Sequence, residues 1–197
     1  MAKIENGSTV VLATSNQGKA KEFRELLAPY NIRVLSAAEA GIDSPDETGT
    51  TFQENSRLKA ENGMKQSGFI CLADDSGLEV EALGGSPGLF SSRFAEEKGG
   101  YEQAMSSLYN QAAEKNNLKA NFTCALSVAF PDAETQTFTG KVFGNLCWPP
   151  HFGSGFGYDP FFVPDGYDKP FGALPPTVKQ QISHRHNALA QFIAACL

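Results

Sequence analysis

The sequence predicts a mixed α/β protein with a long antiparallel element, and three patterns carry this prediction. An apolar run over residues 9–13 leads through a glycine-containing turn into an amphipathic helix. Apolar side chains alternate with smaller or polar ones over residues 121–130, which is the period of a β-strand. A turn at residues 131–134 then favours a hairpin, with residues 135–146 as its second strand.

Length and composition bound the class of protein. The chain has 197 residues, which is most economically a single domain over residues 1–197. Its hydrophobic content of 41% and charged content of 19% are ordinary for a globular protein. No apolar stretch is long enough to span a membrane, and the first residues lack the apolar core of a signal peptide. We therefore expect a cytoplasmic protein with no membrane partner.

Charge and cysteine usage narrow the partners. The net charge is −6, and no cluster of Lys and Arg stands out, which argues against a nucleic-acid partner. An acidic protein still binds a polyphosphate where a few cations converge and a metal assists. We expect reduced thiols in the core rather than disulfides or zinc ligands, because no CxxC spacing occurs among Cys71, Cys124, Cys147 and Cys196.

The first strand and helix form a candidate anion site. After the strand at 9–13, a polar turn at 14–18 leads into a helix at 19–27. Backbone N–H groups at such a helix start can receive an anion, and Lys19 adds a cation there. Taken alone, the same pattern fits an ordinary strand–helix turn with a solvated lysine, and the P-loop pattern GxxxxGK[ST] is absent.

The remaining elements follow from similar signals. Residues 36–50 are polar and turn-rich. A capping-box pattern from Thr51 to Glu54 begins a helix that we expect to reach about residue 66. The other predicted elements are a short strand at 69–73, a loop at 84–88, a helix at 101–115 and a C-terminal helix with its apolar face at Leu189, Phe192, Ile193 and Cys196.

Two adjacent carboxylates, Asp74 and Asp75, follow the strand predicted at 69–73. At the end of that strand they would lie where open α/β sheets bind ligands. Because successive strand residues point to opposite faces, we expect one acid to be structural and the other to face the site. A carboxylate there could hold Mg²⁺, activate a water, or do both. The alternative is a turn in which the aspartates bond local N–H groups.

Two later segments carry groups suited to a nucleobase. Residues 155–162 interleave glycines with aromatic rings, and exposed rings can stack on bases. We expect Phe161 and Phe162 to fold back into the core instead. Ser183, His184 and Arg185 open the last helix, and the planar guanidinium suits carbonyl or phosphate oxygens.

Together these segments resemble the inosine/xanthosine triphosphate pyrophosphatase family over about residues 10–190. The resemblance implies an α/β fold in which a long mixed β-sheet with two lobes is flanked by helices, with the nucleotide in a cleft between the lobes, in a homodimer. It also implies Mg²⁺-dependent hydrolysis of ITP, dITP and XTP to the monophosphate and pyrophosphate, which clears deaminated purines from the nucleotide pool. The matching motifs are Ala13 to Lys19, Glu47 to Asn55, Lys59–Ala60, Ala73 to Leu78, Leu83 to Ser91, Gly155 to Pro160 and Ile182 to Arg185.

The resemblance also assigns residues. Asp75 matches the family's proton acceptor and metal ligand, and Asp46 is the second expected metal ligand, with Glu47 as the alternative. The phosphates would be held by the turn at Thr14, Ser15, Asn16, Gln17, Gly18 and Lys19, together with Lys59. Ser76 would contact the substrate, and the base would be surrounded by Phe156, Gly157, Tyr158, Asp159, Lys179, His184 and Arg185.

Three other functions stay open at this point. One hypothesis is a related enzyme, a pyrophosphatase for other modified nucleotides, as in the Maf-like group. The Ser-His-Arg ending and the Phe-Gly-Tyr-Asp loop favour the inosine/xanthosine triphosphate pyrophosphatase family over it. A nucleotide-binding module without catalysis would bind ITP tightly and not turn it over. An RNA-binding module conflicts with the acidic charge balance.

Overall fold

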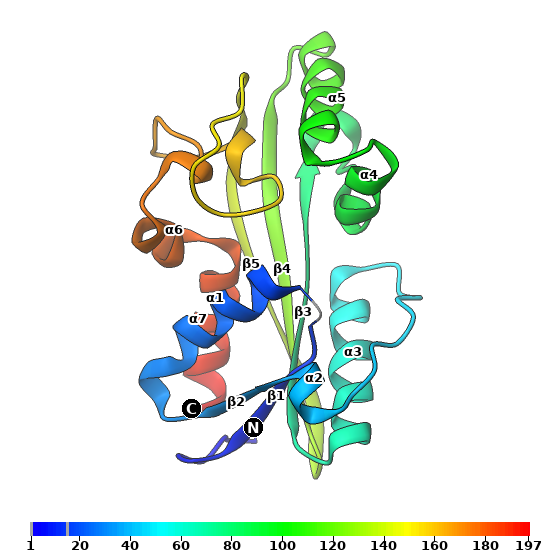
Figure 1. Ribbon diagram of the computed structural model, residues 1–197, viewed down its shortest axis with the longest axis vertical. Helices are drawn as coiled ribbons and strands as arrows, with labels where there is room; N and C mark the ends of the chain where they lie inside the picture. Colours follow the sequence, from blue (N-terminus) through cyan, green and yellow to red (C-terminus); the bar gives the residue numbers. More distant parts are fainter. Residues whose placement is uncertain (1, 15) are drawn as a thin grey trace. The chain divides into compact units, whose positions relative to one another are not determined.

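A computed structural model describes residues 2–14 and 16–197. Its six strands form one sheet in the order β2-β1-β3-β4-β5-β6 (Figure 1). β1 pairs in parallel with β2 and β3, whereas β5 and β6 are antiparallel, so the sheet is mixed as predicted. The strands are β1 (Thr9–Leu12), β2 (Arg33–Ser36), β3 (Ile70–Val80), β4 (Lys119–Phe130), β5 (Ala133–Leu146) and β6 (Phe162–Pro164).

Helices flank this sheet (Figure 1). In the described residues, no helix combines the length and the apolar character that crossing a membrane requires. The helices are α1 (Gln17–Leu27), α2 (Ala37–Ala40), α3 (Phe52–Ser67), α4 (Ser91–Glu97), α5 (Tyr101–Glu114), α6 (Pro176–Ile182) and α7 (His184–Cys196).

The chain divides into two compact units, each assembled from segments that are distant in sequence. Unit 1 comprises Met1–Asp75, Cys124–Gly140 and Arg185–Leu197, and unit 2 comprises Ser76–Thr123 and Lys141–His184. The boundaries between the units therefore include the bonds from Asp75 to Ser76 and from His184 to Arg185, each of which lies within one of the family motifs. A single domain over residues 1–197 and a nucleotide cleft between two lobes stay predictions.

The parallel strands of unit 1 determine where a ligand can be expected. From β1 the chain passes through α1 to β2 on one side, and it returns through α2 and α3 to β3 on the other side of β1. Right-handed crossovers in opposite directions place their helices on opposite faces of the sheet, and Figure 1 shows α1 and α7 on one face and α3 on the other. In such sheets ligands bind at the carboxyl ends of strands where the order reverses, which here means the ends of β1 and the adjoining part of β3.

The core of unit 1 differs between the two faces of the sheet. Large apolar side chains fill the α1 and α7 face, among them Phe23 and Phe192. The α3 face is instead lined by Ala60, Ala73 and Ala129. These small side chains let α3 approach β3 closely, and this approach brings the polar side chains of α3 within reach of the strand.

Unit 2 holds an aromatic core. Leu78 and Val80 of β3 pack with α5 and with a group of phenylalanines. Phe161 and Phe162 are fully buried in this core, as the sequence predicted. All four cysteines are free, and Cys71, Cys124 and Cys196 are buried, in agreement with the expectation of reduced core thiols.

The structure corrects or extends three local predictions. The strand predicted at 69–73 continues to Val80, so both aspartates lie inside β3 rather than at its end. The segment 36–50 was expected to be polar and turn-rich, and the structure adds that Ser36 ends β2 and that residues 37–40 form α2. At the start of α3 the Thr51 side chain accepts from Glu54 N as expected, but the Glu54 carboxylate accepts from Thr50 N at 2.7 Å instead of from Thr51 N.

Gly77 lies within β3, two residues after Asp75. This glycine does not end the strand; it allows the backbone of Gly88 to come close to the strand. A Cβ at position 77 would lie 2.1 Å from Gly88 O and 2.8 Å from Ser91 Oγ. One residue later, Leu78 N donates to Ser91 Oγ at 2.9 Å. The loop that ends at Ser91 is thus held directly against the strand that carries the acids.

Replacing Gly77 with alanine should destabilise the protein, because the added methyl group overlaps backbone that cannot move freely. The expected decrease in the free energy of unfolding is about 1–3 kcal/mol, as for an overpacked site. Urea denaturation followed by circular dichroism measures it. A Gly77→Ala variant with an unchanged midpoint would contradict the close approach of this loop.

Candidate active site

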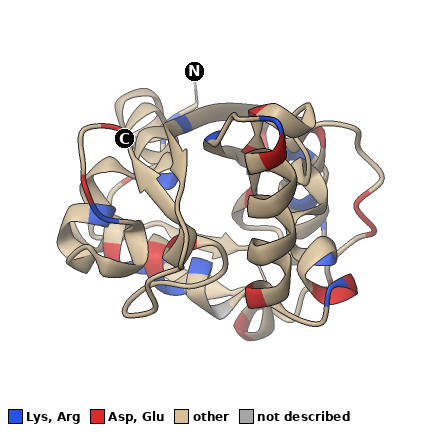
Figure 2. Cartoon of the chain, turned by 90° about the horizontal axis from the view of Figure 1, so that it is seen from above, with Lys and Arg blue, Asp and Glu red and all other residues tan. Residues whose placement is uncertain are grey.

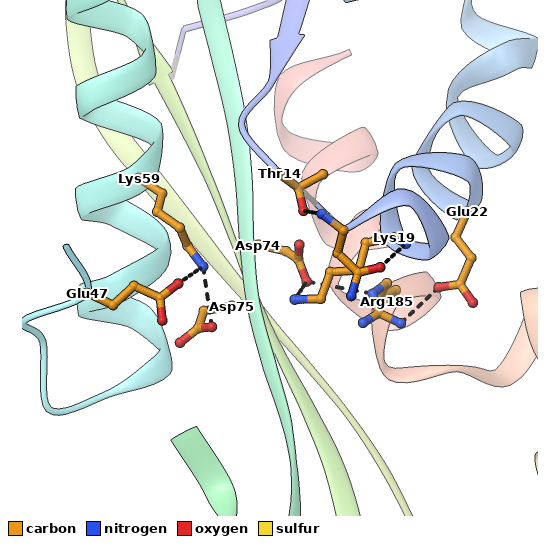
Figure 3. A network of polar contacts seen from close by, with 9 residues as sticks. Thr14, Lys19, Glu22, Glu47, Lys59, Asp74, Asp75 and Arg185 are labelled. Atoms are coloured by element: carbon orange, nitrogen blue, oxygen red, sulfur yellow. Dashed lines mark hydrogen bonds and ion pairs between the residues drawn. The ribbon is translucent and has the colours of Figure 1, made fainter. Parts of the chain in front are cut away.

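Asp74 and Asp75 point to opposite faces of β3 (Figure 3). Asp74 faces α1 and meets Lys19, whereas Asp75 faces α3 and meets Lys59. This confirms the expectation that the two acids do not share one partner. Each acid therefore has its own surroundings, and the two can have different roles.

Asp74 is a buried carboxylate that meets two cations through one oxygen. Its side chain is 0% exposed, and Oδ2 lies 2.9 Å from Lys19 Nζ and 3.6 Å from Arg185 Nε. Arg185 Nη1 in turn donates to Glu22 Oε2 at 2.8 Å. Because β1 pairs Leu12 with Leu72, the turn after β1 continues alongside Asp74, and this register brings Lys19 to it. We infer that Asp74 orients both cations.

The turn after β1 is organised by its own polar side chains. Thr14 Oγ1 accepts from Asn16 N, and Asn16 Oδ1 accepts from Lys19 N, both at 3.2 Å. Asn16 is thereby the N-cap of α1, and Gly18 lies in the first turn. Backbone N–H groups at this end of the helix are suited to an anion. Two expected phosphate contacts, Ser15 and the side chain of Gln17, lie outside what the structure describes.

The two carboxylate oxygens of Asp75 differ in their surroundings. Its Oδ1 lies 3.4 Å from Lys59 Nζ, while Oδ2 is buried and has no hydrogen-bond partner in the part of the chain that the structure describes. Burial raises the pKa of Asp75, against the lowering effect of Lys59 and Lys19. A buried carboxylate oxygen without a partner is uncommon and fits a water or a cation as its missing partner.

Lys59 joins Asp75 to Glu47. Lys59 Nζ donates to Glu47 Oε1 at 2.7 Å. Burial alone would lower the pKa of Lys59, but the carboxylates of Asp75, Asp74 and Glu47 raise it overall, so Lys59 is a cation at neutral pH. Asp46, the expected second metal ligand, lines a surface hollow of about 500 Å³ together with Glu54, Arg57 and Glu61. Its role as a metal ligand stays a prediction.

These residues can be tested for their fit to a metal ion. In residues 2–14 and 16–197 no group of three or more His, Cys, Asp or Glu is arranged to hold a metal. Mg²⁺, however, is commonly held by one or two carboxylates and completes its octahedron with substrate phosphates and waters. Asp75, with its unpartnered Oδ2, and Glu47 fit this mode, because both carboxylates meet at Lys59 Nζ.

In unit 2, Asp159 organises the residues expected at the base. Its Oδ2 accepts from Lys179 Nζ at 2.7 Å and from Phe156 N at 2.8 Å. Lys179 Nζ also lies 4.8 Å from the centre of the half-buried Phe156 ring. Gly155 is required here, since it has φ +85° and a Cβ would lie 2.2 Å from Asp159 Oδ2. One carboxylate thus fixes both the loop that carries Phe156 and the Lys179 cation of α6.

Tyr158 belongs to the scaffold of this loop. It is buried, its hydroxyl donates to Ser91 O at 2.8 Å, and its ring meets Tyr101 edge-on at 5.0 Å. Burial raises the pKa of Tyr158. The expectation that Tyr158 touches the base stays a prediction. The neighbouring Gly157 lies next to Tyr101, because a Cβ there would contact that ring.

His184 is buried in unit 2 and is stacked on the ring of Phe122. Ser76, the other expected substrate contact, is half-buried and directly follows Asp75. Sequence analysis missed Glu22 and Phe122. Glu22 stands three residues after Lys19, on the same face of α1, and this spacing could have revealed it. Phe122 was read only as part of an alternating strand.

Residues 10–195 match the model of the Ham1 family. The chain belongs to the Ham1 family. It is 44% identical over 198 residues to a dITP/XTP pyrophosphatase of Zymomonas mobilis, a match that covers 99% of this chain and 94% of that protein. A dITP/XTP pyrophosphatase of Brucella melitensis is 41% identical over 213 residues, covering 100% of this chain and 96% of the relative.

Solved structures share the fold. The Staphylococcus aureus Ham1 protein superposes with a TM-score of 0.84 at 37% identity, and the match covers 95% of this chain and 97% of that one. A nucleoside-triphosphatase (dITP/XTP pyrophosphatase) of Mycobacterium abscessus superposes with a TM-score of 0.75 at 32% identity, covering 94% and 98%. The expected α/β fold, a mixed sheet flanked by helices, is thereby confirmed.

Asp74→Asn should destabilise this Ham1-family chain, because it removes the buried anion that meets both Lys19 and Arg185. The expected loss is about 3–5 kcal/mol of unfolding free energy, measured by urea denaturation. Glu39→Gln is a matched control, since Glu39 meets Arg24 at the same 2.9 Å distance but with 56% and 43% of the two side chains exposed. The control should change stability little, and equal effects in the two variants would refute the structural role of Asp74.

Proposed function

We propose that this protein hydrolyses deaminated purine nucleoside triphosphates, namely ITP, dITP and XTP, to the monophosphate and pyrophosphate with Mg²⁺. The observation that carries the proposal is Asp75: a buried carboxylate with one oxygen held by Lys59 and the other without a described partner. The names of the relatives, dITP/XTP pyrophosphatases, support the choice of substrate.

Unit 1 supplies the groups that phosphoryl transfer requires, which are mainly positive charge and positioning. Lys59 and Lys19 offset the charge of a triphosphate, and the start of α1 adds backbone donors. Asp75 and Glu47 would hold Mg²⁺, which when bound neutralises charge on the phosphate oxygens. Lys59, placed between the two carboxylates, keeps them together until a cation enters.

The proposed reaction uses one water molecule as the nucleophile and the Asp75 carboxylate as the proton acceptor. Asp75 accepts a proton from water while the water oxygen bonds to the α-phosphorus. The bond from the α-phosphorus to the oxygen bridging to the β-phosphorus breaks, and pyrophosphate leaves with that electron pair. The raised pKa of Asp75, caused by burial, makes this carboxylate a better proton acceptor than an exposed aspartate.

Selection among purines would come from donors at the 6-position. Lys179, held by Asp159, and His184 are N–H donors that match the 6-oxo group of hypoxanthine and xanthine. ATP presents an amino group at the same position, so donors would oppose donors and remain unsatisfied. Sites built this way discriminate strongly, because the wrong base leaves buried polar groups unpaired.

The alternative functions fit less well. The match over residues 10–195 favours the Ham1 family over the Maf-like group. Figure 2 shows Lys and Arg spread over several elements and interspersed with acidic residues, which does not favour RNA binding. A binding module without catalysis would not need the buried Asp75 with its unpartnered oxygen. A homodimer in the cytoplasm, as the family resemblance implies, is part of the proposal.

Pyrophosphate release from ITP, XTP, dITP, GTP, ATP and UTP in the presence of Mg²⁺ tests the proposed function. We expect kcat/KM to be highest for ITP, dITP and XTP. Asp75→Asn keeps the shape of the side chain but removes the proton acceptor, so turnover should fall by about 10²–10⁴. Equal rates with GTP and ITP would end the substrate assignment, and a fully active Asp75→Asn variant would end the role of Asp75.

The metal assignment is tested by comparing two neighbouring acids. Glu47→Gln should raise the Mg²⁺ concentration needed for half-maximal rate by about 10-fold or more, the usual effect of disturbing a metal site. Asp46→Asn is the matched control and should leave this concentration unchanged, because Asp46 lines the surface hollow beside Glu54 and Arg57. The reverse result, with Asp46→Asn raising the Mg²⁺ requirement, would return the ligand role to Asp46.

A further inference from the structure

The His184 side chain lies on an aromatic platform, the ring of Phe122, which is not part of the motif from Ile182 to Arg185. The imidazole lies parallel to the ring of Phe122, with centroids 4.9 Å apart and an angle of 14° between the planes. Both side chains are nearly inaccessible to solvent, with 2% of His184 and 6% of Phe122 exposed. Both belong to unit 2. Offset-stacked rings at this separation attract each other beyond the burial of their area.

Phe122 is itself fixed in place. Its ring meets Phe162 edge-on at 4.8 Å and lies 6.3 Å from Phe171. Phe162 and Phe171 are 0% exposed and lie 5.5 Å apart. Close packing against these rings restricts the rotamers open to a side chain on a β-strand. Phe122 is therefore a rigid support rather than a mobile neighbour.

The same cluster reaches the second donor expected at the base. Lys179 Nζ lies 5.9 Å from the centre of the Phe171 ring, in addition to its contact with Phe156. Cations are attracted to the faces of aromatic rings at such distances. His184 and Lys179 are thus both in contact with side chains of one packed aromatic group, although they lie in different helices.

We propose that Phe122 is a positioning residue that holds the His184 imidazole in the plane from which a ring N–H addresses the 6-oxo edge of the purine. This role rests on the proposed function. An imidazole has two side-chain torsions, and its hydrogen bonds lie in the plane of the ring. Stacking on Phe122 fixes that plane. Without the platform, His184 keeps its chemistry but loses its orientation.

The consequence is specific to substrate selection. A misoriented donor weakens the contact with a 6-oxo base, while ATP, which offers an amino group there, loses nothing. Phe122→Leu should therefore lower the ratio of kcat/KM for ITP to that for ATP by about tenfold, the effect of one well-oriented hydrogen bond. Turnover chemistry at Asp75 should be affected much less, because Asp75 belongs to unit 1.

The test compares Phe122→Leu with Phe162→Leu and Phe122→Tyr. Phe162 is a matched control, since its ring contacts in the described residues are with Phe122 and Phe171. Both leucine variants remove a ring from the same cluster and should lower the melting temperature to a similar degree. Phe122→Leu should lower the ITP-to-ATP ratio clearly more than Phe162→Leu, which leaves the ring stacked on His184 in place, and Phe122→Tyr, which keeps the aromatic face, should retain the wild-type ratio.

A spectroscopic readout does not depend on activity. In the wild-type protein the ring current of Phe122 should shift the His184 ring protons upfield of those of His151 and His186, and His184→Gln identifies the signals. Phe122→Leu should abolish the shift, and Phe162→Leu should keep it. If the folded wild type lacks this upfield shift of the His184 ring protons, the proposed stacking on Phe122 is overturned, even if no variant folds.

The two failures are distinguishable. A wild-type protein without activity on ITP overturns the proposed function. An active, selective wild type whose ITP-to-ATP ratio is unchanged in Phe122→Leu, or falls equally in Phe162→Leu, overturns the role of Phe122 alone.

Discussion

The alternation of side chains along β3 is the constraint on which the site depends. Two carboxylates adjacent in the sequence are both buried, and on one face they would repel each other. The pleat of the strand sends them to opposite faces, where each meets its own cations. Asp74 is neutralised by Lys19 and Arg185 and orients them. Among the described residues, Asp75 forms an ion pair with Lys59 through Oδ1, and its Oδ2 has no hydrogen-bond partner.

The topology of unit 1 supplies the two faces. The crossover from β1 to β2 and the crossover from β2 to β3 run in opposite directions, which places α1 on one face of the sheet and α3 on the other. Each acid therefore faces a helix that carries a lysine within reach of it. Small residues at Ala60 and Ala73 let α3 approach closely enough for Lys59 to reach the strand. The scaffold thus determines the electrostatics before any ligand is present, which is the preorganisation that phosphoryl transfer requires.

Sequence patterns predicted the parts of this arrangement that local chemistry determines. Periodicity placed α3, α5 and β4 within a few residues, and the alternation rule separated Asp74 from Asp75. The family motifs named the candidate residues, but not their partners. β3 continues past the acids as a strand paired within the sheet, and Gly88 lies close to Gly77; both are tertiary contacts, which leave no local signal. For the same reason the stacking of His184 on Phe122 and the contact of Glu47 with Lys59 required the structure.

A crystal structure with Mg²⁺ and a non-hydrolysable analogue of ITP tests the central claim most directly. The division of labour between the two acids predicts an ion about 2.0–2.1 Å from Asp75 Oδ2, with Glu47 as its second carboxylate and with Asp74 still paired with Lys19. An ion bound by Asp74, or an Asp75 side chain remote from both the ion and the phosphates, would contradict it.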